Sequence, residues 1–152
     1  FSLDALKYAK QKKISYDVEH SVSKTIAAFG NTVGGTLYIG VDNDTRDIVG
    51  LNFDYEFCKK QNDDGFMFEL KNSICHLINK EFFYLSNELI RIIPYDGKEI
   101  CVIKMKPSWF ALIINGVDKK EFYVRINDIS EDFTINGFLN HWVDHIINLR
   151  KS

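Results

Sequence analysis

The spacing of hydrophobic positions changes in the middle of residues 17–41. Before Gly30, apolar side chains recur at the spacing of one helix face, at Val18, Val22, Ile26 and Phe29. After Gly35 they alternate with polar or small residues, as on a strand with one buried face, at Leu37, Ile39 and Val41. Gly30-Asn31 suits the left-handed backbone that often ends a helix, and the next glycines allow a tight turn. The pattern predicts a helix, a glycine-rich corner and a strand.

The same pattern predicts the elements that follow. Residues 42–47 are dense in turn formers and predict a β-hairpin onto residues 48–51. Asp63-Asp64 can cap a helix that ends near Lys80. Strands are then expected at residues 89–93, 99–105, 110–114 and 121–126, and a last helix from about Asp132. We therefore expect an α+β fold, with one mixed or antiparallel sheet of about five to six strands flanked by two or three helices.

Length and composition limit the class of protein. The 152 residues suit a single domain over 1–152, and the start at Phe1 suggests a piece excised from a longer protein. No apolar run is long enough to span a bilayer, and the charged N-terminus does not resemble a signal peptide, so no membrane partner is expected. Three widely spaced cysteines indicate free thiols in a reducing cytoplasm.

The charge balance constrains binding to polyanions. The formal net charge is −2, whereas strong nonspecific nucleic-acid binders are usually basic, so any such site must be a local patch. Its candidate cations are Lys7, Lys10, Lys12, Lys13, Lys104, Lys106 and Arg125. Aromatic residues that could stack on bases are Tyr8, Tyr16, Trp109 and Tyr123. The alternative is a solvated lysine face, with Arg125 in a structural pair with Asp128 or Asp42.

Two separated motifs carry a family resemblance. The run Ala28–Gly35 (AFGNTVGG) is followed by Ile39–Asp42 (IGVD) and Ile48–Leu51 (IVGL). Further on come Lys106–Ser108 (KPS) and Phe122–Arg125 (FYVR). In this order the motifs resemble the Schlafen/AlbA-like family of DNA-binding domains. The resemblance implies a noncatalytic module that binds DNA or RNA, within a larger transcriptional regulator.

The glycine corner offers a possible phosphate site at Asn31, Gly34 and Gly35. Backbone N–H groups beside a helix end attract anions. The corner is not a Walker loop, because no Gly-Lys-Ser/Thr follows and it leads from helix into strand. We expect no nucleotide cofactor. The alternative role is structural, with Asn31 capping the helix and the glycines permitting a tight connection.

Carboxylates raise the question of a metal-dependent reaction. The aspartates from Asp42 to Asp47 do not form an EF-hand loop, because its sixth and twelfth positions hold Asp47 and Phe53. Some Schlafen relatives are endoribonucleases with two glutamates and one aspartate. That resemblance assigns Asp42 the aspartate role, and Asp4 is the only carboxylate before Asp17. A nuclease using Asp42 and Asp4 is therefore the alternative to a noncatalytic domain.

A final pair of histidines lies on the last predicted helix. His141 and His145 are four residues apart and can share one face, but zinc would need another ligand from elsewhere. A polar helix face is the ordinary interpretation, and we assign no metal site. The apolar residues of this helix leave a third hypothesis, an interaction domain that forms a homodimer without binding nucleic acid.

Overall fold

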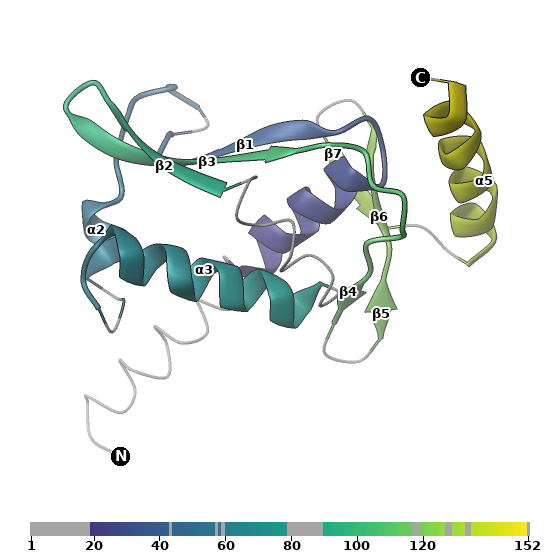
Figure 1. Ribbon diagram of the computed structural model, residues 1–152, viewed down its shortest axis with the longest axis horizontal. Coiled ribbons are helices and arrows are strands. Elements are labelled where there is room, and N and C mark those ends of the chain that lie inside the picture. Colours follow the sequence, from purple (N-terminus) through teal and green to yellow (C-terminus); the bar gives the residue numbers. More distant parts are fainter. Residues whose placement is uncertain are drawn as a thin grey trace, which may run out of the picture.

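The computed structural model describes residues 19–42, 44–56, 58, 60–78, 90–116, 119–126, 129–132 and 135–151. A first helix covers residues 19–30. The other elements are β1 (Gly35–Ile39), α2 (Asn52–Tyr55), α3 (Asp63–Leu77), β2 (Ile90–Tyr95), β3 (Lys98–Met105), β4 (Ile114–Asn115), β5 (Lys120–Glu121), β6 (Tyr123–Ile126), β7 (Ile129–Asp132) and α5 (Ile135–Lys151) (Figure 1). None of the helices in these residues combines the length and apolar character needed to cross a bilayer.

The predicted α+β class is confirmed. Within the described residues the strands form an antiparallel sheet in the order β1-β3-β2 and two antiparallel pairs, β4-β5 and β6-β7. The sequence pattern had suggested one larger sheet. Helix 19–30 and α3 lie on one side of the three-stranded sheet, and α5 stands at the far end beside β6 (Figure 1).

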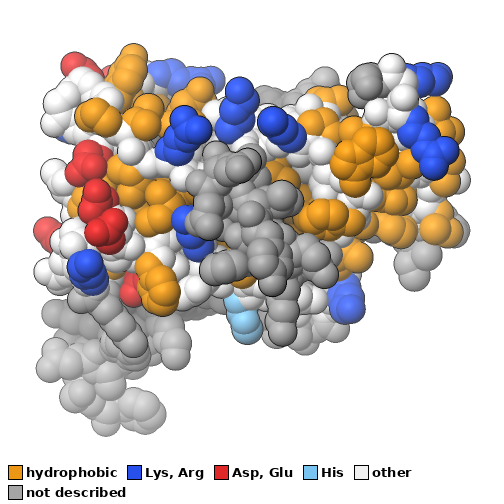
Figure 2. All heavy atoms as spheres, viewed as in Figure 1, with side chains coloured by type: hydrophobic (Ala, Val, Ile, Leu, Met, Phe, Trp, Pro, Cys, Tyr) orange, Lys and Arg blue, Asp and Glu red, His pale blue; other side chains and the backbone are white. Residues whose placement is uncertain are grey.

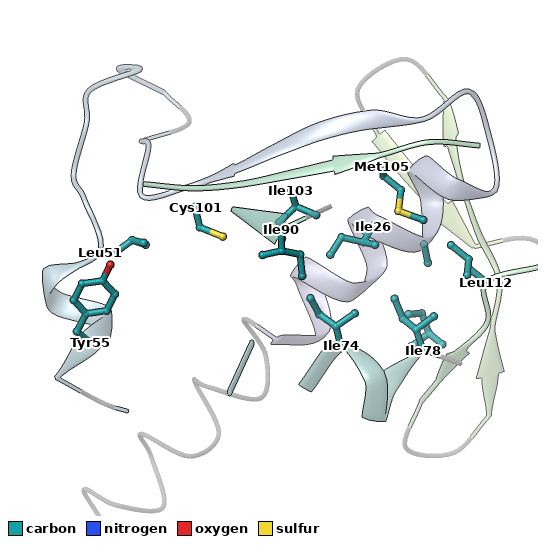
Figure 3. Close-up of a cluster of buried hydrophobic side chains, with 12 residues drawn as sticks. Ile26, Leu51, Tyr55, Ile74, Ile78, Ile90, Cys101, Ile103, Met105 and Leu112 are labelled. Carbon is teal, nitrogen blue, oxygen red and sulfur yellow. The ribbon is translucent and has the colours of Figure 1, made fainter. Parts of the chain in front are cut away.

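The core lies between the three-stranded sheet and these two helices. Alternate residues of β3, namely Cys101, Ile103 and Met105, are buried and point toward Ile26 of the first helix and Ile74 of α3 (Figure 3). Burying one such aliphatic side chain contributes about 1.5–3 kcal/mol. The alternation of β3 therefore fixes which face of the sheet is covered and which face points outward.

The glycine corner differs in detail from the prediction. The left-handed residue is Gly34, with φ of 84°, whereas neither Gly30 nor Asn31 has positive φ. The N–H of Gly34 donates to the carbonyl of Phe29 at 2.8 Å and so closes the helix end. Gly30 is required for packing, since a Cβ there would lie 2.4 Å from Cδ1 of Leu112. Sequence alone could not separate these two reasons for a glycine.

Asn31 is a buried connector between distant segments. Its side chain is 0% exposed, and its Nδ2 donates to the carbonyls of Leu112 and Tyr123, each at 2.9 Å. Its Oδ1 accepts from the N–H of Leu112, also at 2.9 Å. Both amide hydrogens and the amide oxygen of Asn31 are therefore engaged inside the protein, and its role in binding nucleic acid stays a prediction. The side chain ties the first helix to the segments of β4 and β6.

Several element boundaries also differ. The side chain that caps α3 is Asn62, which accepts from the N–H of Gly65 at 2.9 Å, and not Asp63-Asp64. The predicted strand over 110–114 is reduced to β4, because Ser108 Oγ bonds both the N–H and the carbonyl of Phe110. Such local bonds compete with a strand ladder. Strand β7 was not predicted, and the expected hairpin after Asp42 forms a single bridge, Val41–Ile48.

We predict that Asn31→Ala lowers the free energy of unfolding by about 2–5 kcal/mol. The substitution leaves three buried backbone groups without partners, and each such group costs about 1–3 kcal/mol. Urea denaturation measures the loss. Asn72→Ala is the matched control, since Asn72 is exposed on α3 and its loss should change stability by no more than about 0.5 kcal/mol. Equal effects from the two variants would contradict the connector role.

Candidate nucleic-acid interface

Lys104 and Lys106 project from the outward side of the sheet. Both are exposed, while Met105 between them is buried in the core at 4% exposure. This follows from strand geometry, because successive side chains point to opposite faces. Thr36 of β1 lies opposite Lys104 in the register. Figure 2 shows Lys and Arg side chains gathered along the upper part of the molecule over this sheet, whereas acidic side chains gather at the left, near α2.

Arg125 is held in place on β6 without a carboxylate. Its backbone N–H donates to Thr32 Oγ1 at 2.9 Å, and its Nη1 donates to Ser130 Oγ at 2.9 Å. The guanidinium also lies 5.1 Å from the ring centroid of Phe29. No ion pair of Arg125 occurs within the described part of the chain, so the proposed pair with Asp42 is not seen, and Asp128 lies outside that part. A positioned guanidinium of this kind can bind phosphate.

The glycine corner lies between these cations. A Cβ on Gly34 would come within 3.4 Å of the Cα of Lys106, and one on Gly35 would come within 2.6 Å of the Phe29 ring that lies beside Arg125. Both glycines are therefore explained by close packing. The N–H of Gly34 already donates to the carbonyl of Phe29, and the role of Gly34 and Gly35 as a phosphate site stays a prediction. The corner brings the two cation-bearing segments together.

The stacking residues are only partly those expected from sequence. Trp109 is 60% exposed and remains available. Tyr123 is engaged inside the protein, because its hydroxyl donates to Glu121 and the amine of Lys24 lies 5.7 Å from its ring centroid. Tyr38 was missed, although the strand alternation places it outward, and it is 54% exposed. The other predicted residues lie outside the described part of the chain, namely Asp4, Lys7, Tyr8, Lys10, Lys12, Lys13 and Tyr16.

The histidine pair attaches α5 to the corner. Nε2 of His145 lies 2.8 Å from the carbonyl oxygen of Ser108, and Nε2 of His141 bonds the carbonyl oxygen of Asn31. A carbonyl can only accept, so each Nε2 carries a hydrogen and cannot ligate a metal in this arrangement. Among the described residues, no three His, Cys, Asp or Glu side chains gather to hold a metal ion. The pair therefore acts as a docking contact.

Asp42 anchors the turn after β1. Its Oδ1 accepts from the backbone N–H groups of Asp44 and Thr45, each at 2.9 Å. The bonds from Thr45 and then Asp44 lower the pKa of Asp42 below its ordinary value of 3.8, because they stabilise the carboxylate. The carboxylate is exposed and holds the turn closed. A catalytic role would require it to serve a metal as well.

Comparison with known proteins agrees with this arrangement. The family model described as Schlafen, AlbA_2 matches residues 6–134, which include the glycine corner, Lys104, Lys106 and Arg125. The chain belongs to the Schlafen AlbA_2 family. Membership of this family favours a function related to nucleic acid.

Individual relatives are distant and much longer. Poxin-Schlafen of Monkeypox virus is 27% identical over 70 residues, covering 46% of this chain and 14% of the viral protein. Poxin-Schlafen of the Zaire-96-I-16 strain matches equally. The crystal structure of the DIP2311 protein from Corynebacterium diphtheriae superposes with a TM-score of 0.56 and 14% identity over 83% of this chain and 19% of that one. This last match supports the fold alone.

We predict that the Asp42 carboxyl titrates below 3.8 and stabilises the fold in a pH-dependent way. Because its folded pKa is lower than its unfolded pKa, the stabilisation is present above about 3.8 and is lost as the pH falls through the folded value. Asp42→Ala should therefore destabilise the protein at neutral pH and have less effect as the pH falls below 3.8. Carboxyl NMR titration and pH-dependent unfolding measure both effects.

The control for this prediction lies in the same turn. Asp44→Ala keeps the backbone N–H that Asp42 accepts from, so it should leave the Asp42 titration in place. Magnesium or manganese should not move that titration if Asp42 serves only the turn. A metal-dependent shift would contradict this role and would support the nuclease alternative.

Proposed function

We propose that this chain is a noncatalytic nucleic-acid-binding module that holds the phosphate backbone through Lys104, Lys106 and Arg125. The observation that carries the proposal is that the segments bearing these cations meet at one glycine corner. Lys104 and Lys106 point outward from a buried strand, and Arg125 is oriented by Ser130 and Phe29 instead of by a carboxylate. Fixed cations without acidic partners favour polyanion binding. From the sequence, we propose that further phosphate contacts are made by Lys7, Lys10, Lys12 and Lys13.

The wider setting is part of the same proposal. We infer that the module belongs to a longer protein, since the curated relatives that it matches are several times its length. That this longer protein is a transcriptional regulator is proposed from the family resemblance. A cytoplasmic location is favoured by the three free thiols Cys58, Cys75 and Cys101. Absence of catalysis is favoured by the use of Asp42 in its turn.

We predict that Lys104→Gln and Lys106→Gln each weaken binding to labelled DNA and RNA. Each loss of a phosphate contact should reduce the slope of log affinity against log salt by about 0.7–0.9. Fluorescence anisotropy at about 50 and 200 mM salt measures both quantities, and affinity should fall steeply across this range. Because phosphate contacts carry no sequence information, the weakening should be similar for unrelated sequences.

Lys60→Gln is the matched control for these variants. Lys60 is an exposed lysine just before α3, away from the sheet. Its Nζ lies 3.9 Å from Oδ2 of Asp64. Its substitution changes the net charge by the same amount, so it separates a local contact from the overall charge. If Lys60→Gln weakens binding as much as Lys106→Gln, the proposed interface is wrong. Cleavage of the oligonucleotide in manganese, abolished by Asp42→Ala, would instead support a nuclease.

A second candidate function is self-association through α5. Leu139, Val143 and Ile147 recur every four residues on this helix and are 55%, 58% and 44% exposed. Their spacing places them on one face of α5, opposite the side that holds His141 and His145. Such an apolar stripe suits contact with a second copy of the chain.

We predict that the protein, if it dimerises through this stripe, is converted to a monomer by Val143→Glu. The charge would lie at the centre of the apolar contact, where it cannot be solvated. Sedimentation over a range of concentrations measures the change, with Asn140→Glu on the same helix as the control. A monomer at all concentrations in the unchanged protein would refute this second candidate.

A further inference from the structure

The three-stranded sheet has an outward face that no described helix covers. Helix 19–30 and α3 both pack on the opposite side (Figure 1). The register of the strands fixes which residues share the outward face, because directly paired residues point the same way. Its outward positions are Thr36 and Tyr38 on β1, Lys98, Ile100, Val102 and Lys104 on β3, and Arg91, Ile93 and Tyr95 on β2.

Two exposed tyrosines lie on this face. Tyr38 is 54% exposed and Tyr95 is 56% exposed. Tyr38, Val102 and Arg91 form one row across the sheet. Since neighbouring strands lie about 4.8 Å apart, the Tyr38 and Arg91 positions are about 10 Å apart. The two tyrosines lie on the edge strands β1 and β2, about 16 Å apart by the same geometry. Between them lie Ile93 and Val102, which are half-buried, and Ile100, which is 4% exposed.

The charges on the face all have one sign. Arg91, Lys98 and Lys104 occupy outward positions, and no carboxylate does so on these three strands. This contrasts with the net charge of −2 for the chain. Lys98 is less available for a phosphate, because its amine already donates to the carbonyl of Ile48 at 3.0 Å. Arg91 lies in the same row as Tyr38, and Lys104 lies in the next row beside Thr36; both cations are exposed.

We propose that this face binds single-stranded nucleic acid, with unpaired bases stacked on Tyr38 and Tyr95 and phosphates held by Arg91 and Lys104. The inference rests on the proposed function and names its ligand class. Flat rings beside cations are the combination by which single strands are held without base-specific hydrogen bonds. In a duplex the base faces are already stacked inside the helix, so they cannot stack on exposed tyrosine rings of a sheet.

The test compares single and double strands on the same protein. Labelled oligo(dT) and oligo(U) of about 12 nucleotides, within the site sizes of comparable surfaces, are titrated beside a duplex of equal length. Tyr38→Ala should weaken single-strand binding about 5- to 100-fold, as expected for one lost stacking contact. Tyr38→Phe should retain binding within about twofold, because it keeps the ring. Comparison of the affinities for oligo(dT) and oligo(U) shows whether the face prefers single-stranded DNA or RNA.

Controls address folding and general loss of aromatic surface. Phe68→Ala removes an aromatic residue that is 66% exposed on α3, and it should leave binding unchanged. Tyr38→Thr keeps strand propensity and should reproduce the loss if Tyr38→Ala is poorly folded. Ultraviolet crosslinking of the unchanged protein to a bromouridine strand should label the tryptic peptides 25–46 and 92–98, which hold the two tyrosines.

The outcomes distinguish this inference from the proposed function. If the protein binds neither duplex nor single strand, both are wrong. If it binds duplex more tightly, or Tyr38→Ala leaves single-strand affinity unchanged, this inference alone is overturned. Dissociation of a protein dimer by Tyr38→Ala, with no change in single-strand binding, would likewise overturn it and would assign the face to a protein partner.

Discussion

A single buried amide holds together the parts of this molecule that carry its candidate chemistry. The three hydrogen bonds of Asn31 connect the end of the first helix to Leu112 and Tyr123, which are 81 and 92 residues further along the chain. Thr32 then bonds the N–H of Arg125, so the register of β6 is set by the residue next to Asn31. Because a buried amide is costly to leave unpaired, these segments can occupy only one relative position.

Close packing around the glycines extends the same constraint. Gly30 admits Leu112, Gly34 admits the carbonyl of Met105, and the N–H of Ser108 donates to the carbonyl of Gly30 at 2.8 Å. The carbonyls of Asn31 and Ser108 then receive the two histidines of α5. Helix, sheet and final helix therefore meet at one short segment. The AFGNTVGG run is explained mainly as the junction of the fold, and the proposed ligand site lies beside it.

The sequence could predict those features that depend on local periodicity. It predicted the first helix, β1 and β3. It also singled out Lys104 and Lys106, whose exposure follows from alternation alone. It could not predict the partners of Asn31, because these bonds join residues far apart in the chain. Strand β7 was missed because pairing with β6 is its main determinant.

The candidate site residues show the same difference between what local sequence predicts and what depends on tertiary contacts. Arg125 was identified from a motif, but its environment of Phe29 and Ser130 is tertiary. The histidines were correctly placed on one helix face, yet their partners are backbone carbonyls that no spacing rule identifies. Tyr38 was not among the predicted stacking residues, because no lysine or arginine lies near it in sequence. The side chains beside a residue in a sheet come from neighbouring strands, so identifying them requires the pairing register of the strands.

The net charge of −2 does not describe the outward face of the sheet, because several acidic residues have structural roles elsewhere in the fold. Asp63 and Asp64 lie in the first turn of α3, where they favour the positive end of the helix dipole. Asp42 closes its turn, and Glu121 pairs with His20 at 3.3 Å. Electrostatic attraction between exposed groups is screened beyond about 8–10 Å at ordinary salt. An approaching phosphate therefore responds to the sheet face that it meets, which presents cations and no carboxylate, and only weakly to the acids placed elsewhere by the needs of folding.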